Sequence, residues 1–152
     1  MVLVDEEATA NAMALLLERC KLVVEGAGAV GVAAILNGSV EPVDGTTVAV
    51  LSGGNIDATL LAAIARRYDT ESGRRLVALT RIPDRPGGLA TLLAAIANSG
   101  ANLVDVSHVR EGLDLHVRET AVELVLETRG HEHAQRVLAA LQKEGYQAQV
   151  LR

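Results

Sequence analysis

Two glycine-rich turns carry the residue types best suited to chemistry, and the first is Ser52-Gly53-Gly54-Asn55. It follows the apolar run 47–51 and precedes a helix that Asp57 can cap. In α/β sheets, ligands bind beyond the carboxyl ends of the strands. A serine hydroxyl there can hydrogen-bond a neutral ring atom, and the glycines let a ring approach the backbone. A plain glycine turn before a capped helix is the alternative, and the pattern leaves both readings open.

The second turn is Asp84-Arg85-Pro86-Gly87-Gly88-Leu89, between a strand pattern and a helix pattern. Backbone N–H groups at a helix N-terminus bind carboxylates. The turn is therefore a candidate site for the anionic end of a small ligand. Pro-Gly turns before helices also occur without any ligand, so ordinary turn chemistry stays open as the alternative.

Residues 26–31 (GAGAVG) match the spacing G-x-G-x-x-G of dinucleotide-binding sites. In those sites an acidic residue follows about 20 positions later. Glu41 and Asp44 are the nearest candidates, but both fall in the loop 39–46, before the next strand. Too few strand patterns are present for a mononucleotide-binding half. The favoured interpretation is a small-residue helix packed closely on a neighbour, with dinucleotide binding as the alternative.

The two lysines, Lys21 and Lys143, do not have the surroundings of a catalytic amine. A nucleophilic lysine needs desolvation or a neighbouring cation. Lys21 precedes a short strand pattern, and Lys143 lies on an exposed late helix turn. The single cysteine, Cys20, excludes an internal disulfide and is expected to be a buried small apolar side chain.

The histidines do not predict a metal site. His131 and His133 are two residues apart at a helix start, so they point in different directions. His108 and His116 flank a hairpin connection and are expected to be its polar groups.

Composition excludes several classes of function. The net charge is −5, and no basic run occurs, which argues against binding nucleic acid or anionic membranes. No apolar run reaches the roughly 18 residues of a membrane-spanning helix. The N-terminus has no secretion-signal pattern, so a cytoplasmic location is expected.

The first 68 residues predict an α/β arrangement. Periodicity and capping residues indicate a helix from Asp5 to about Cys20, a short buried strand or its approach at 21–25, a helix ending at Asn37–Gly38, a strand at 47–51 and a helix from Asp57 to about Tyr68. The polar segment 69–73 is predicted to be a linker between two domains.

Residues 74–152 predict a complete βαββαβ domain of the ferredoxin-like, α+β type. The elements are a strand at 75–82, a helix ending at Asn98–Ser99–Gly100, a strand at 102–110, a hairpin connection at 111–118, a strand at 119–129, a helix stopped by Gly145 and a strand at 147–151. Val122, Leu124 and Leu126 are expected to face the helices, with Glu123, Glu127 and Asp105 on the other face. At this size the domain is a marginal monomer, so pairing with a second copy is expected.

These residues suggest a family. The runs VVEGAGAVGVAAIL (23–36) and VAVLSGGNID (48–57) resemble the C-terminal part of the catalytic domain of threonine dehydratases (threonine ammonia-lyases), pyridoxal-phosphate enzymes of the tryptophan-synthase-like fold. Residues 74–110 and 122–133 resemble the ACT domain attached to many of them. The resemblance implies that 1–68 is part of a catalytic domain and 74–152 an amino-acid-binding regulatory domain. The parent enzyme would deaminate L-threonine to 2-oxobutanoate and ammonia in isoleucine and threonine metabolism.

The resemblance also implies roles for individual residues around the cofactor. Ser52 matches the serine whose hydroxyl meets the pyridine nitrogen of pyridoxal phosphate, Gly53, Gly54 and Asn55 match the turn around it, and Glu25 matches a glutamate near the ring. The family's cofactor-binding lysine and its phosphate-cradling glycine loop belong upstream and have no counterpart here. The chain is therefore expected to be the C-terminal piece of a larger enzyme, without catalytic residues, lyase activity or bound cofactor of its own.

In ACT domains an amino acid binds between paired domains, near the first turn. The resemblance places the effector at Asp84, Arg85, Pro86, Gly87, Gly88 and Leu89, together with Asn102, Leu103 and Val104 at the start of the second strand. Isoleucine or another branched-chain amino acid is the expected effector, and a homodimer or higher homo-oligomer is the expected assembly. The alternative is a stand-alone ACT-type amino-acid-binding protein.

Overall fold

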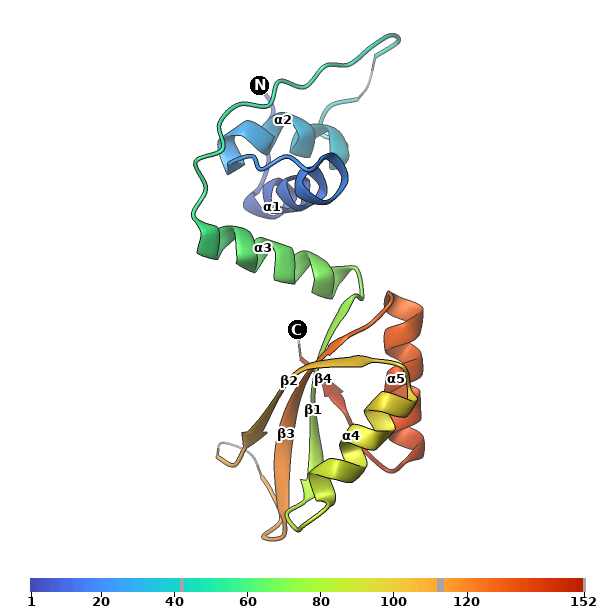
Figure 1. The fold of residues 1–152 in the computed structure, drawn as a ribbon. Helices are drawn as coiled ribbons and strands as arrows, with labels where there is room; N and C mark the ends of the chain where they lie inside the picture. Colours follow the sequence, from blue (N-terminus) through green and yellow to red (C-terminus); the bar gives the residue numbers. More distant parts are fainter. Residues whose placement is uncertain (42, 112–113, 152) are drawn as a thin grey trace. The chain divides into compact units, whose positions relative to one another are not determined.

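The computed structural model describes residues 1–41, 43–111 and 114–151. The chain divides into two compact units, Met1–Tyr68 (unit 1) and Asp69–Arg152 (unit 2), and each is described by itself. Figure 1 shows unit 1 as helices joined by long extended segments and unit 2 as a sheet with two helices.

Unit 1 is built on two helices with small side chains between them. Helix α1 (Glu6–Leu15) continues as a π-helical turn, η1 (Leu16–Cys20), and is followed by α2 (Gly26–Leu36). The Asp5 carboxylate accepts a hydrogen bond from the Ala8 N–H at 2.7 Å, which caps α1 as its sequence predicts. The helices pack through a core rich in alanine, which allows close approach, and its buried members are Ala12, Met13, Leu16, Val24, Ala29 and Ala33.

The strands predicted at 21–25 and 47–51 are wrong. Neither segment forms a strand in the described part of unit 1. Val48 and Val50 are 79% and 80% exposed. The β-branched run gives an extended backbone, but a strand also needs a neighbour to accept its hydrogen bonds, and none of the described residues of unit 1 supplies one.

Cys20 is exposed, so its predicted burial is also wrong. The helical stretch stops at Lys21, which adopts a left-handed conformation (φ 59°), and Leu22 donates its N–H to the Leu16 carbonyl at 3.1 Å. This C-terminal cap places Cys20 in the last, exposed turn, where periodicity alone does not indicate which side faces the core.

Unit 2 confirms the βαββαβ order. Its elements are β1 (Arg75–Pro83), α4 (Gly88–Asn98), β2 (Asn102–Val109), β3 (Glu119–Glu127), α5 (His131–Lys143) and β4 (Gln149–Val150). The sheet has the order β2-β3-β1-β4 with all neighbours antiparallel, the ferredoxin-like arrangement. Its core joins side chains of the sheet to those of both helices: Leu76, Ile82, Leu92, Ile96, Val122, Leu124, Leu126, Val137 and Leu141.

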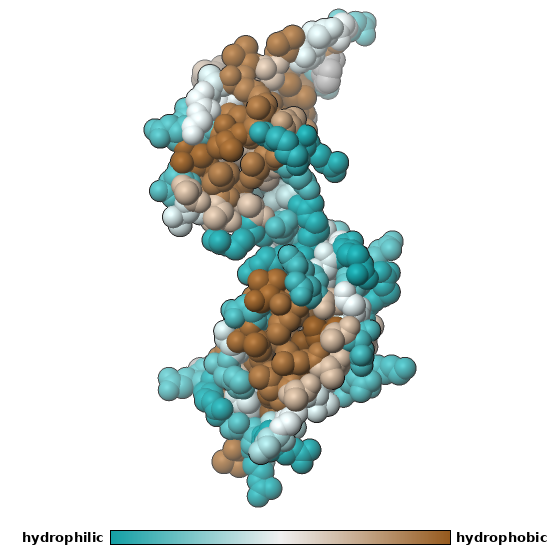
Figure 2. All heavy atoms as spheres, viewed as in Figure 1, coloured by the Kyte–Doolittle hydropathy of each residue, from teal (hydrophilic) through white to brown (hydrophobic). Residues whose placement is uncertain are grey.

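The register confirms the predicted face of the acidic residues. Glu123 pairs with Leu79 and Glu127 with Arg75, whereas Leu124 and Leu126 point to the helices. A bulge between Leu103 and Asp105 shifts β2 by one residue, which puts Asp105 opposite Val125, on the face of the glutamates. In Figure 2, hydrophobic residues lie at the centre of the visible face of unit 2, and hydrophilic residues surround them.

Several predicted boundaries move. Strand β3 ends at Glu127 instead of residue 129, and β4 covers only Gln149–Val150 instead of 147–151. The predicted linker 69–73 is partly helical, because the helix α3 (Ala58–Glu71) continues through its first three residues. Of the predicted hairpin connection 111–118, residues 112 and 113 lie outside the described residues. No described helix has the length and apolar character needed to span a membrane.

Candidate functional site

The first glycine turn lies against Glu25 and the start of α2. The Glu25 N–H donates to the Gly53 carbonyl at 3.2 Å. A Cβ added at Gly53 would lie 2.1 Å from the Glu25 Oε1, and one at Gly54 would lie 3.2 Å from the Val23 carbonyl oxygen. The fold therefore brings the turn 52–55 together with Glu25, the five residues that the sequence resemblance groups.

Gly28 has a structural role that explains its place in the G-x-G-x-x-G pattern. A Cβ at Gly28 would lie 1.8 Å from the Ser52 carbonyl oxygen and 2.8 Å from Val24 Cγ1. The space beside Gly28, which a dinucleotide would need for close approach to the backbone, is occupied by the turn 52–55 of the same chain. This contact supports the interpretation of 26–31 as a closely packed small-residue helix.

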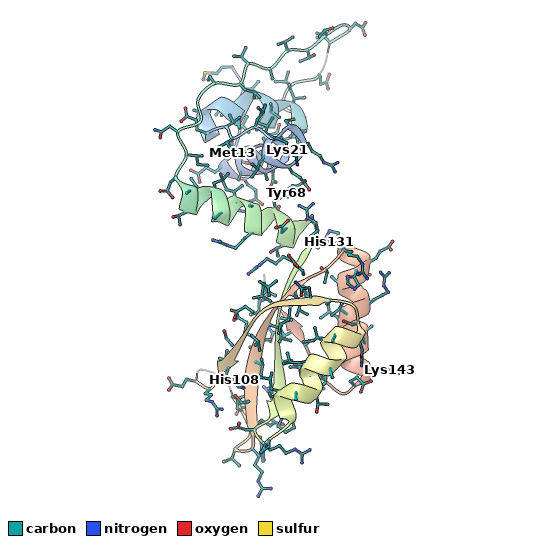
Figure 3. The ribbon with its side chains drawn as sticks, viewed as in Figure 1. Met13, Lys21, Tyr68, His108, His131 and Lys143 are labelled. Atoms are coloured by element: carbon teal, nitrogen blue, oxygen red, sulfur yellow. The ribbon has the colours of Figure 1, made fainter. Side chains whose placement is uncertain are left out.

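The turn can meet the ring edge of a planar cofactor but not hold it covalently. Ser52 is exposed, and its hydroxyl has no hydrogen-bond partner among the residues the structure describes, while Glu25 is half-buried beside it. The Lys21 ammonium donates to the Glu18 carbonyl at 2.6 Å, in the cap of its own helical turn. Lys143 ends α5 in unit 2 (Figure 3). The residues present thus fit one edge of a pyridoxal-phosphate site.

The second turn presents free backbone donors at the N-terminus of α4. The Arg85 N–H donates to the Pro83 carbonyl at 2.9 Å and the Gly88 N–H to the Arg85 carbonyl at 3.0 Å. Within the described chain, no acceptor meets the N–H groups of Gly87, Leu89 and Ala90. Gly87 has φ 88°, a left-handed conformation that favours glycine. Three donors at the positive end of a helix can bind a carboxylate.

Asp84 ties this turn to both sides of the β2–β3 connection. Its N–H donates to the Arg118 carbonyl at 2.8 Å. Its carboxylate accepts from Arg110, Nη1 to Oδ2 at 2.8 Å and Nη2 to Oδ1 at 3.4 Å. The Arg110 hydrogen bond, followed by the charges of Arg110 and His108, lowers the pKa of Asp84, and the same bond raises the pKa of Arg110. Sequence reasoning did not identify Arg110, because the pair spans 26 positions and no local pattern indicates it.

Replacing Arg110 by alanine is expected to raise the pKa of Asp84 toward its ordinary value. Because the folded-state pKa is lowered, the pair stabilises the fold above the unfolded-state pKa and loses this effect as pH falls through the folded-state value. The acid-induced loss of stability should therefore be smaller in Arg110→Ala. Carboxyl carbon NMR titration measures the pKa. Arg118→Ala is the control, because its side chain is exposed and only its backbone oxygen contacts Asp84. An unchanged Asp84 titration in Arg110→Ala would contradict the assignment.

Asn102, Leu103 and Val104 do not meet the turn within one copy. Asn102 pairs with Glu127 and donates to its Oε2 at 2.8 Å, at the end of the sheet where β1 begins. The turn follows the other end of β1, where Pro83 pairs with Glu119. Val104, in the bulge, is 58% exposed. In a single copy the predicted effector residues therefore form two separate groups.

His133 is a structural side chain. It is 2% exposed, its Nδ1 accepts the Arg129 N–H at 3.0 Å, and its Nε2 lies 3.1 Å from the Ser99 carbonyl oxygen and 3.3 Å from the Arg129 Nη2. It thereby joins the end of α4 to the start of α5. No three histidine, cysteine or acidic side chains of the described residues are grouped so as to hold a metal.

Comparison with known proteins identifies relatives along the whole chain. L-threonine ammonia-lyase of Geobacter sulfurreducens is 46% identical over 152 residues, covering 100% of this chain and 38% of that protein. The chain is homologous to the C-terminal portion of L-threonine ammonia-lyases. The L-threonine ammonia-lyase of Thermotoga maritima is 41% identical over 152 residues, covering 99% of this chain and 37% of the relative. The chain thus spans less than two fifths of the length of these L-threonine ammonia-lyases.

Two further comparisons are more limited. The catabolic L-threonine dehydratase of Escherichia coli K12 is 42% identical over 71 residues, 45% of this chain and 22% of that protein. A prephenate dehydratase structure from Streptococcus mutans aligns with a TM-score of 0.41 at 19% identity, over 51% of this chain and 41% of that one. No family model matches the chain. The fold assignment of unit 2 rests on its own strand order and not on the solved structure.

Proposed function

We propose that this chain is the amino-acid-sensing C-terminal part of a threonine ammonia-lyase that deaminates L-threonine to 2-oxobutanoate and ammonia. Residues 1–68 would contribute to a catalytic domain of the tryptophan-synthase-like fold, and 74–152 would form an ACT domain after the linker 69–73. The observation that carries the proposal is the 46% identity to the L-threonine ammonia-lyase of Geobacter sulfurreducens across the whole chain.

Unit 1 would supply one edge of the pyridoxal-phosphate site. The cofactor, when bound, would withdraw electrons from the α-carbon of the substrate while the β-hydroxyl group is eliminated. Ser52 would hydrogen-bond the ring nitrogen without placing a formal charge beside it, whereas a carboxylate would hold that nitrogen protonated. Glu25 would lie near the ring, positioned by the hydrogen bond between its N–H and the Gly53 carbonyl. The covalent lysine would belong to another segment of the enzyme.

Unit 2 would pair with a second copy through β2 and α4. Strand β2 is an edge strand, so its outer hydrogen-bonding groups have no partner within the described sheet. The side of α4 that faces away from the core carries small exposed side chains, namely Ala90, Ala94 and Ala97. An edge with unpaired hydrogen-bonding groups and a helix face that permits close approach suit a self-complementary, two-fold interface.

This pairing would complete the effector site. If two β2 strands pair antiparallel about a two-fold axis, the start of one strand lies beside the end of the other. Residues 102–104 of the second copy would then approach the 109–110 end, which Arg110 joins to Asp84. The effector carboxylate would bind the N–H groups of Gly87, Leu89 and Ala90. Val104 of the second copy would contact its side chain, which favours a branched-chain amino acid such as isoleucine.

The test measures assembly and ligand binding in the same samples. We expect the chain to sediment as a dimer and to bind L-isoleucine in isothermal titration, without threonine ammonia-lyase activity. Val104→Asp should give a monomer and weaken isoleucine binding at least tenfold, because each interface would bury two carboxylates without a hydrogen-bonding partner, one beside each effector site. Val117→Asp is the matched control, since Val117 is also exposed but lies outside β2. A strict monomer that binds no amino acid at millimolar concentration would overturn the proposal.

A further inference from the structure

Unit 1 leaves large apolar side chains exposed from its first residues to α3. Among the described residues, Val104, Val117 and Val150 are the exposed large apolar side chains of unit 2, and all the others belong to unit 1. Figure 2 shows hydrophobic residues gathered on the visible face of unit 1. Contiguous apolar surface of this kind marks a site where another protein segment packs. Unit 1 therefore carries an interaction surface.

The segment 48–51 is apolar on two sides, and only one side is covered. Ala49 and Leu51 are half-buried, and Leu51 packs on the core of unit 1. Val48 and Val50 alternate with them and are 79% and 80% exposed. Alternation with a period of two places side chains on opposite sides of the backbone, as in a strand. Val48 and Val50 thus form an uncovered apolar side, opposite the side that packs on the core.

The segment 22–25 lies beside the end of that segment and is divided in the same way. Val24 is 6% exposed and belongs to the core of unit 1, whereas Val23 is 48% exposed. The Glu25 N–H donates to the Gly53 carbonyl at 3.2 Å, so the two segments meet at their carboxyl ends, and α2 connects them. Two apolar segments joined by a helix in this way have the layout of a βαβ unit, whose strands are parallel.

A parallel pair of strands needs more than unit 1 supplies. Parallel sheets are covered by apolar layers on both faces. In the described part of unit 1, the core between α1 and α2 covers one face, and Val23, Val48 and Val50 stay exposed on the other. The partner of this surface must therefore provide strands that pair with the two segments and an apolar layer that covers the three valines.

The relatives contain enough chain to provide such a partner. The chain is homologous to the C-terminal portion of L-threonine ammonia-lyases and covers 38% of the Geobacter sulfurreducens protein. Most of that enzyme therefore lies upstream of the matched region. A long upstream part can contribute both the strands and the apolar layer, and it is joined to unit 1 in the same polypeptide.

We propose that the upstream part of the same enzyme packs on Val23, Val48 and Val50 and pairs with 22–25 and 47–51 as neighbouring strands. The inference rests on the proposed function and identifies the partner of the surface of unit 1. It explains why 47–51 has a strand's composition but forms no strand in this chain. Because the turn 52–55 follows directly, the same pairing fixes the position of that turn in the complete enzyme.

The test compares one substitution in two proteins. The first is the isolated chain, and the second is a fused enzyme that joins the upstream part of the Geobacter sulfurreducens L-threonine ammonia-lyase to all 152 residues. In the isolated chain, Val50→Asp should move the midpoint of thermal unfolding by less than about 2 °C, because Val50 is 80% exposed. In the fused enzyme it would bury an unpaired carboxylate, so the midpoint should fall by about 10 °C or more, with loss of lyase activity. Val48→Asp should have the same effects.

Val117→Asp is the matched control, because Val117 is 89% exposed but lies in unit 2. It should leave the unfolding midpoints of both proteins and the activity of the fused enzyme unchanged.

The outcomes separate this inference from the proposed function. If the unsubstituted fused enzyme is active and Val50→Asp melts with Val117→Asp in it, the surface inference is wrong and the proposed function stands. An unsubstituted fused enzyme that neither folds nor has lyase activity would overturn both. If Val50→Asp already dissociates or destabilises the isolated chain, a second copy covers the valines and the upstream part is not their partner.

Discussion

Replacing Gly28 by alanine is expected to lower the free energy of unfolding of unit 1 by about 3 kcal/mol, the upper range for overpacking a rigid site. The new Cβ would lie 1.8 Å from the Ser52 carbonyl oxygen, a distance at which the backbone must move. The turn 52–55 would shift away from α2, and its contact with Glu25 would be lost with it.

Gly31→Ala is the matched control, because Gly31 lies three residues further along the same helix. A Cβ there would meet only the Ala49 Cβ, at 3.9 Å. Since alanine favours a helix over glycine by about 1 kcal/mol, this variant should be as stable as the wild type or more stable. Urea unfolding followed by circular dichroism compares the two variants. Equal midpoints for Gly28→Ala and Gly31→Ala would show that the turn does not press against α2.

Replacing Gly88 by alanine is expected to destabilise unit 2 by about 2 kcal/mol, because overpacking forces backbone shifts. The added Cβ would lie 2.3 Å from the Pro83 carbonyl oxygen, which accepts the hydrogen bond from Arg85 that shapes the turn. The backbone conformation at Gly88 is helical, so the cause is lack of space and not strain. A larger side chain at Gly88 would therefore disturb the fold before it could report on ligand approach.

Gly87 separates the ligand effect from the fold effect. A Cβ added at Gly87 would have no described atom within 4 Å, although the φ of 88° disfavours most residues. Asparagine tolerates this region better than others, so Gly87→Asn should cost less than about 1 kcal/mol. Its side chain would nevertheless cover the free N–H groups of the turn, and isoleucine binding should fall at least tenfold.

Thermal unfolding and isoleucine titration of the two glycine variants provide the measurement. We expect Gly88→Ala to lose stability and binding together, and Gly87→Asn to lose binding alone. If Gly87→Asn binds isoleucine like the wild type, the turn is not the carboxylate site. If Gly88→Ala melts with the wild type, the contact with Pro83 does not restrain the turn.

The sequence by itself determined the elements whose signals are local. Asp5 begins α1 because its carboxylate satisfies a free helix N–H group, and Gly145 stops α5 as its position predicts. In unit 2, the apolar stripes of two helices and the alternation in β3 indicated which residues share the core. These patterns are sufficient because each βαβ half of this unit finds its partners within the same 79 or so residues.

The tertiary structure decided everything that depends on a partner far along the chain. Residues 47–51 have a strand's composition, but no described neighbour in unit 1 pairs with them, so they form no strand, and Val48 and Val50 stay exposed. Arg110 forms an ion pair with Asp84, and the Ser52 carbonyl oxygen fills the space beside Gly28. Both contacts join residues that are far apart in the sequence, so no local sequence pattern predicts them. Local propensity acts within a few residues, whereas strand pairing, ion pairs and close backbone contacts require two distant segments to meet. For this reason the sequence alone located both candidate turns. Their free N–H groups, the ion pair between Asp84 and Arg110, and the contact between Gly28 and the Ser52 carbonyl were identified only from the folded structure.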